Sequence, residues 1–408
     1  MPPTLDQLLT DLTAAVHAGD RTRALDLARQ IQQRLLTETM DHARVERELR
    51  ALLAALEMPR AELPSTSVKS LAPERAGAEA TDGVVYPVWF GTNRAPDGRG
   101  GFTSERHPQT TLGRVLVHVP RAHRFGETGS PFWKRLLRFD LRDDRLRVQA
   151  VAARDSAAFF AEVGAALEAA RESGDGPQAL VYLHGYNTGF EDAVIRAAQI
   201  GFDLKVPGAT ACFSWPSRGT VAGYPADEAT IEASEGAIAR FLLDFAAGCG
   251  DAKFNVIAHS MGNRGLLRAL QRIAAGAGTR GGVRLGQVFL AAPDIDRGLF
   301  LDLAHLYPSA SERTTLYASD GDLAVHASAQ LHAAPRAGYF EPYTVAPGID
   351  TVAVPDFDLD LLGHGYFAQA EALLHDLYSL MRHGEPPERR QRLEPAFAGG
   401  VSFWRLRR

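Results

Sequence analysis

The chain has 408 residues, of which 45% are hydrophobic and 23% charged, and its formal net charge is −5. This composition is typical of a soluble globular protein, and the negative charge favours neither nucleic acid nor an anionic membrane surface. No apolar run reaches the length of a membrane span, and two cysteines are too few for a disulfide framework. The first residues lack the basic and apolar regions of a secretory signal. We therefore expect a cytoplasmic protein with no membrane span and no nucleic-acid partner.

The first part of the chain, residues 1–59, predicts a small helical module. Three segments carry leucine and other apolar residues at helical spacing, and Pro59 ends the last of them. Helices of this size pack on each other or on a partner, so the module is a candidate for homo-oligomer formation. Residues 60–82 are rich in Pro, Ala, Ser and Glu and predict a linker.

Residues 83–383 alternate between short apolar runs and helical patterns, which predicts an α/β fold with a mostly parallel central sheet flanked by helices. Helical patterns lie near residues 190–204, 227–247, 261–275 and 366–382. Residues 384–408 are rich in Pro and Arg, and we interpret them as a C-terminal tail. The expected strands are Val84–Phe90, Val115–Val119, Ala179–Leu183, Thr210–Phe213, Phe254–Ile257, Val288–Ala291, Thr314–Tyr317 and Thr351–Val354.

One strand ends in Ala258-His259-Ser260-Met261-Gly262 and is followed at once by a helical pattern. This layout is typical of a nucleophile elbow, in which a tight turn presents a serine above the sheet. The positions two before and two after the serine must be small, as Ala258 and Gly262 are. The alternative interpretation is a strand end followed by a serine that caps the helix.

A serine nucleophile needs backbone donors for the oxyanion that develops during attack. His184-Gly185-Tyr186 follows an earlier strand, and the N–H groups of Tyr186 and Met261 are the predicted oxyanion hole. His184 and Trp215 are assigned to the substrate pocket. The alternatives are a structural hydrogen bond for His184 and a core position for Trp215.

The base and the acid of a catalytic triad are expected in loops that follow later strands. His364, between two glycines and after the last expected strand, is the predicted base. Asp322 is the favoured acid, and Asp294, which follows the preceding strand, is the alternative. Asp356–Asp360 lacks the Gly and Glu of a calcium loop, so we expect no metal.

Several blocks in a fixed order resemble the bacterial α/β-hydrolase family that is catalogued as a domain of unknown function. The resemblance covers residues 84–383 and implies a lipase-like or esterase-like serine hydrolase without a settled substrate. The matching blocks are Phe90–Arg94, Val119-Pro120 with His123, Leu183–Asn187, Phe213–Ser217, His259–Gly262, Ala291–Asp296 and Gly363–Tyr366.

These patterns together predict a serine hydrolase that cleaves a small-molecule carboxylic ester through an acyl-enzyme on Ser260, with no cofactor. Two alternatives stay open. The same triad would also serve acyl transfer to an alcohol or amine. A non-catalytic α/β-hydrolase scaffold would instead use the N-terminal helices to recruit a partner.

Overall fold

The computed structural model describes residues 7, 8, 11, 83–123, 125, 145–219, 223–280, 282–319, 323–354 and 367–407. From residue 83 onward, these residues belong to one compact unit that spans residues 80–130 and 142–408. The proposed helical module and linker lie outside the described residues, apart from Gln7, Leu8 and Asp11, which are helical. Asp322, His364 and the segment Asp356–Asp360 also lie outside them.

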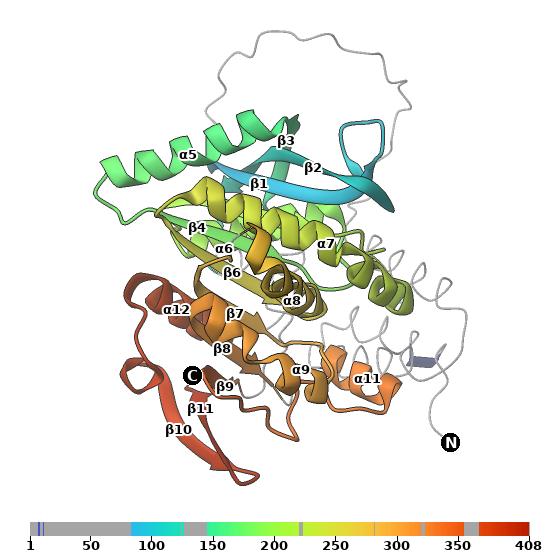
Figure 1. Cartoon of the computed structure of the whole chain (residues 1–408), viewed down its shortest axis with the longest axis vertical. Coiled ribbons are helices and arrows are strands. Elements are labelled where there is room, and N and C mark those ends of the chain that lie inside the picture. The colour runs from blue at the N-terminus through green and yellow to red at the C-terminus, as the bar shows by residue number, and fades with distance from the viewer. Residues whose placement is uncertain are drawn as a thin grey trace. The chain divides into compact units, whose positions relative to one another are not determined.

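Eleven strands of the described residues form a single sheet in the order β10-β11-β9-β8-β7-β6-β4-β5-β1-β2-β3 (Figure 1). The pairs from β1 through β5, β4, β6, β7, β8 and β9 to β11 are parallel, and antiparallel pairs lie at both ends. The strands are β1 (Gly83–Pro96), β2 (Phe102–Pro120), β3 (Arg147–Arg154), β4 (Gln178–Leu183), β5 (Gly208–Ser214), β6 (Lys253–His259), β7 (Leu285–Ala291), β8 (Ser311–Ala318), β9 (Ile349–Ala353), β10 (Leu393–Ala398) and β11 (Val401–Leu406).

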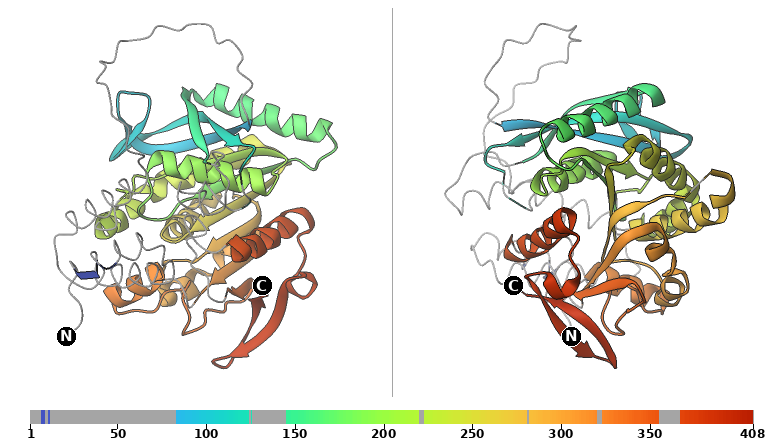
Figure 2. Two further views of the ribbon diagram at one scale, coloured as in Figure 1. Left: turned by 180° about the vertical axis from the view of Figure 1, so that it is seen from behind. Right: turned by 60° about the vertical axis from the view of Figure 1, so that its left-hand side comes forward.

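Helices cover both faces of this sheet (Figure 2). One face packs against α5, α7, α8 and α9, and the other packs against α6 and α12. None of the described helices is both long and apolar enough to cross a membrane. The helices are α5 (Ser156–Glu172), α6 (Phe190–Asp203), α7 (Tyr224–Cys249), α8 (Gly262–Arg280), α9 (Arg297–Leu303), α10 (Leu306–Ala310), α11 (Leu323–His332) and α12 (Phe367–His383), with a 3-10 turn at Pro387–Arg389.

The central strands are buried on both faces, as their continuous apolar runs predict. Every residue of β4 and of β7 is buried. A hydrophobic core lies on each face of the sheet, and successive strand residues pack into opposite cores. Val181 packs on the α7 and α8 side, whereas Leu180 and Tyr182 pack on the α6 and α12 side. The predicted mostly parallel sheet flanked by helices is confirmed.

The strand order reverses between β4 and β6, which is the feature that locates the site. The chain leaves β4 toward β5 on one side and then crosses back to β6, from which it continues toward β9 on the other side. In open α/β sheets, ligands bind in a crevice beside such a reversal, at the carboxyl edge of the sheet, where the loops after β4 and β6 begin.

The C-terminal segment differs from the tail that the composition indicated. Residues 393–398 and 401–406 form the hairpin β10–β11, and Trp404 and Arg405 of β11 pair with Val352 and Ala353 of β9 (Figure 1). Buried Arg390 ties this segment to the sheet through Asp376 and the Tyr317 hydroxyl. The segment is thus part of the sheet, because tertiary pairing overrides a weak local pattern.

Candidate active site

Ser260 lies on the tight turn between β6 and α8, and its backbone has a φ of 49°. A residue with a side chain rarely adopts this left-handed conformation, which persists only where surrounding bonds hold it. Here the Ser260 N–H donates to Ala291 O at 2.9 Å, and Ser260 O accepts from Asn263 N at 3.1 Å and Asp294 N at 3.2 Å. The turn therefore has the geometry that the elbow motif requires.

Two glycines lie at positions where a side chain would clash with the Ser260 turn or with the loop after β4. A Cβ on Gly262 would lie 2.5 Å from His184 O, so the start of α8 packs directly on the loop after β4. A Cβ on Gly185 would lie 3.0 Å from the Cβ of Ser260. The loop that carries Tyr186 thus passes against the serine, and the sequence motif correctly anticipated small residues at Gly262 and Gly185.

His184 and Trp215 support this loop from within the core. Both are fully buried, and their rings stack at 5.0 Å with an interplanar angle of 11°. Trp215 Nε1 donates to His184 O at 2.8 Å, and His184 Nδ1 lies 2.7 Å from Gly185 O. Burial, with a smaller effect of the Arg94 charge, lowers the pKa of His184 to about 3, so the ring is neutral. We predicted that they line a substrate pocket, but their enclosure favours a supporting role.

Arg94, near the end of β1, joins the loop after β4 to the end of β5 and the loop that follows it. It is 1% exposed, and its Nε donates to Ser214 Oγ at 2.9 Å. Its Nη1 donates to Ser217 O at 3.0 Å, and its Nη2 donates to Thr188 O at 2.8 Å. Desolvation lowers the pKa of Arg94 to about 10, so the guanidinium stays charged at neutral pH.

Asp227, in the first turn of α7, is the buried acid near this guanidinium. Its carboxylate accepts from Ser217 Oγ at 2.6 Å, from Arg218 N at 2.8 Å and from Asn187 N at 3.3 Å. Burial raises the pKa of Asp227, and these hydrogen bonds oppose the rise. We name this group the Arg94 cluster, and its members are Arg94, Thr188, Ser214, Ser217 and Asp227.

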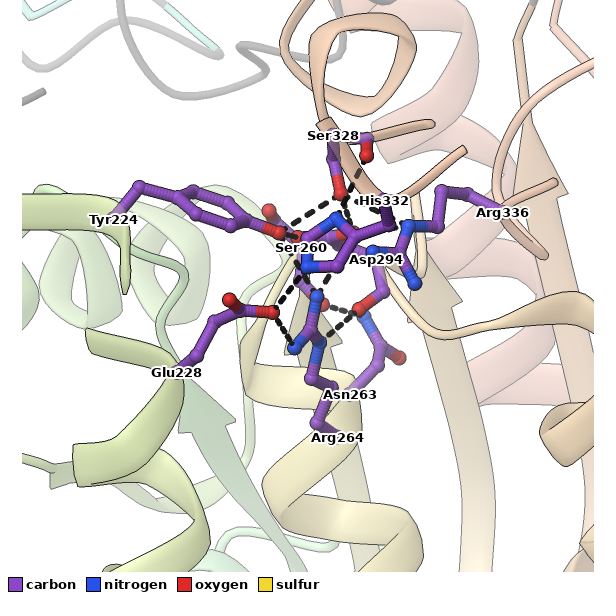
Figure 3. Close-up of polar contacts among 9 residues, drawn as sticks. All are labelled: Tyr224, Glu228, Ser260, Asn263, Arg264, Asp294, Ser328, His332 and Arg336. Atoms are coloured by element: carbon purple, nitrogen blue, oxygen red, sulfur yellow. Dashed lines mark hydrogen bonds and ion pairs between the residues drawn. The ribbon is translucent and has the colours of Figure 1, made fainter. Parts of the chain in front are cut away.

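Asp294, the alternative acid, is the centre of a second buried group (Figure 3). Its carboxylate accepts from Tyr224 Oη and from Ser328 Oγ, each at 2.5 Å. Arg264 Nη2 and Arg336 Nε each lie 3.4 Å from Asp294 Oδ1. We name this group the Asp294 cluster, and its members are Tyr224, Glu228, Arg264, Asp294, Ser328, His332 and Arg336.

His332, on the last turn of α11, completes the Asp294 cluster. Its Nδ1 lies 2.8 Å from Ser328 O, and its Nε2 lies 2.7 Å from Glu228 Oε1. Both ring nitrogens thus lie within hydrogen-bond distance of an oxygen, one on α11 and one on α7. Glu228 also pairs with Arg264, so α7, α8 and α11 meet here (Figure 3).

The sequence motifs led to the serine and to the loop beside it, but not to either cluster. Arg94 lay in a recognised block without an assigned role, and Asp227 was not singled out. A signal was present, because an arginine that ends an apolar strand needs buried acceptors. Among the described residues, no group of three or more His, Cys, Asp or Glu side chains is arranged to hold a metal ion.

A comparison with protein families shows the family to which the chain belongs. Residues 161–382, more than half of the chain, match the family described as "Alpha/beta hydrolase of unknown function (DUF900)". A solved structure titled as a predicted CIB-like hydrolase from Thermoplasma acidophilum has 14% sequence identity and a TM-score of 0.30. That match covers 51% of this chain and 87% of the other. No curated protein matches.

Proposed function

Since the chain belongs to the family of alpha/beta hydrolases of unknown function, we propose that it is a serine hydrolase of carboxylic esters. Ser260 is the nucleophile of this proposal, His364 is the base, and Asp322 orients the base. The substrate is a small-molecule ester, and the reaction needs no cofactor.

The observation that carries the proposal is the backbone of Ser260. A serine with a φ of 49° between a buried strand and a helix is costly unless the turn has a use. It stands at the point where the strand order reverses, beside a glycine that lets another loop approach. This combination supports presentation of the Ser260 hydroxyl to a ligand in the crevice.

In the proposed acylation, His364 takes the hydroxyl proton of Ser260 as the oxygen attacks the ester carbonyl. The N–H groups of Tyr186 and Met261 stabilise the negative oxygen of the tetrahedral intermediate. The intermediate collapses, the bond to the alcohol breaks, and His364 returns the proton to the leaving oxygen. In the second half, His364 activates a water that releases the acid and restores Ser260.

The choice of Asp322 over Asp294 as the acid follows from the partners of Asp294. Within the described part of the chain, its two carboxylate oxygens accept from two hydroxyls and face two guanidiniums, and none of these four partners is an imidazole. Asp322→Asn is therefore expected to reduce turnover by about 10⁴-fold, as loss of a triad acid does, with unfolding unchanged. A loss of that size in Asp294→Asn instead would transfer the role to Asp294.

The direct test is labelling of the full chain with a fluorophosphonate, followed by intact mass and peptide mapping. We expect one adduct, on Ser260, in the wild type and none in Ser260→Ala, which also loses ester turnover by about 10⁴-fold or more. Ser309→Ala is the matched control, because Ser309 is exposed on α10. Normal labelling of the Ser260→Ala protein would refute the proposal. Products formed in the presence of competing alcohols and amines then separate hydrolysis from acyl transfer.

Gly185→Ala tests the oxyanion loop separately from the nucleophile. The added Cβ meets the Ser260 Cβ and His259 Nδ1 at 3.0 Å each, so the loop must shift by a few tenths of an ångström. We expect kcat to fall by about 10²-fold, the effect of losing one oxyanion donor, with KM little changed. Unaltered kcat would exclude the backbone of this loop from the oxyanion hole.

A further inference from the structure

A second cavity, of about 100 Å³, lies between α7, α8 and the loop that leads from β7 into α9. It has room for several water-sized groups. Its walls include the apolar side chains of Ile231, Leu267, Ile295 and Leu299 together with charged side chains. This cavity is separate from the crevice at Ser260, since Ser260 does not line it.

Arg336 also lines this cavity, and it is 4% exposed. Its Nε donates to Ser328 Oγ at 2.9 Å and lies 3.4 Å from Asp294 Oδ1. Its Nη2 is buried and has no hydrogen-bond partner within the part of the chain that the structure describes. A buried donor on a charged group costs free energy when it is unpaired. This nitrogen is covered by protein atoms, so an acceptor in the cavity would satisfy it once the Arg336 side chain turns toward that acceptor.

The other charged groups of the lining are engaged or face solvent. Glu235 lies within 4.0 Å of Arg268 and within 3.7 Å of Arg272, both on α8. Asp296 Oδ1 accepts from Leu299 N at 2.9 Å and caps α9. Glu232 is exposed on α7.

Arg264 is likewise engaged, because it pairs with Glu228 and its Nε donates to Asp294 O at 2.5 Å. The unsatisfied hydrogen-bonding capacity at the cavity is therefore a guanidinium donor, which a carboxylate fits best. The lining carries three acidic residues and three arginines, so it has no excess of positive charge for a multiply charged anion such as phosphate.

We propose that this cavity binds a small monocarboxylate. Its carboxylate accepts from Arg336, and its short hydrocarbon part packs against Ile231, Leu267, Ile295 and Leu299. The site is coupled to the elbow, because Arg336 faces Asp294 and the Asp294 N–H donates to Ser260 O. An effect of this ligand on ester turnover would rest on the proposed function, because ester hydrolysis releases carboxylates. Binding of the ligand to the cavity does not rest on it.

The experiment measures butyrate binding to the full chain by calorimetry at constant ionic strength, with butyramide as the uncharged comparison. We expect saturable binding of butyrate and none of butyramide. Ser260→Ala is expected to bind butyrate as the wild type does, whatever the outcome of the fluorophosphonate test. Equal binding of butyramide would overturn the carboxylate assignment, and loss of binding in Ser260→Ala would move the ligand to the active site.

Two variants locate the site. Arg336→Lys keeps the charge but loses the planar fork, and we expect butyrate to bind at least tenfold more weakly. Leu299→Trp adds bulk to the cavity wall and leaves the Arg336 residue in place. It is expected to abolish binding, so the test survives if Arg336→Lys does not fold. Arg272→Lys, on the exposed side of α8, is the matched control and binds normally. Wild-type affinity in a folded Leu299→Trp protein would refute the proposal.

Discussion

The Arg94 cluster and the Asp294 cluster both hold loops that contact the Ser260 turn, but they do so with different chemistry. Arg94 bonds chiefly to backbone carbonyls, those of Thr188 and Ser217, and so fixes the course of the chain directly. The Asp294 carboxylate bonds to side chains, those of Tyr224 and Ser328, which belong to α7 and α11. The first cluster therefore restrains backbone, whereas the second joins helices through groups that can change partners.

This difference indicates how each cluster affects the site. Loss of a guanidinium that holds carbonyls leaves several buried acceptors unpaired and removes the positive charge near the buried carboxylate of Asp227. Loss of the Asp294 charge leaves two guanidiniums that retain other partners, since Arg264 also pairs with Glu228. We therefore expect the Arg94 cluster to be the more sensitive of the two.

Arg94→Met is the change with the largest expected effect. It should lower the free energy of unfolding by about 3–5 kcal/mol, because the carbonyls of Thr188 and Ser217 lose their donor and buried Asp227 loses the positive charge near it. Chemical denaturation measures this loss, and Arg99→Met, at an exposed position on the following turn, serves as the control. A loss no larger than that of the control would mean that the cluster does not restrain the fold.

Asp294→Asn is expected to lower the free energy of unfolding by less, about 2–3 kcal/mol. The amide keeps the shape and one acceptor, but it removes the charge that faces Arg264 and Arg336. Denaturation of Asp294→Asn and Arg94→Met under the same conditions gives the comparison directly. If Asp294→Asn were the more damaging, the order of the two clusters proposed above would be reversed.

His184, in the loop after β4, makes the stability of the fold depend on pH. The folded-state pKa is about 3 and the ordinary value is 6.5, so the unfolded chain binds the proton first between these values. Stability therefore falls on acidification below pH 6.5, by up to about 1.4 kcal/mol per pH unit from this group.

The measurement is the free energy of unfolding between pH 7 and pH 4. His184→Asn should show a shallower slope than the wild type, whereas His305→Asn, at an exposed position, should keep the wild-type slope. Parallel slopes for all three proteins would contradict a neutral buried His184.

Tyr224→Phe has the smallest expected effect and should lower the free energy of unfolding by about 1 kcal/mol. It removes one hydroxyl that donates to Asp294 and contacts Ser328, while the ring still packs edge-on against Tyr186 at 5.3 Å. Thermal unfolding together with ester turnover checks this result. A large loss of turnover without loss of stability would show that the Tyr224 hydroxyl acts in the reaction itself.

The central strands and the elbow were predictable because their signals are local. A strand buried on both faces must be apolar throughout, as β4, β6 and β7 largely are. The turn at Ser260 needs small residues within two positions on either side. Edge strands carry weaker patterns, so β3 at one end of the sheet and β10 and β11 at the other were not anticipated.

By itself, the sequence determined the fold class and the position of the serine, since strand runs, helix spacing and a tight turn depend on neighbouring residues. Only the tertiary structure decided which distant groups meet. Arg94 and Ser214 are 120 positions apart, and Tyr224 and Asp294 are 70 positions apart. A buried charge must find its partners wherever the sheet order brings them, and that order appears in no local pattern.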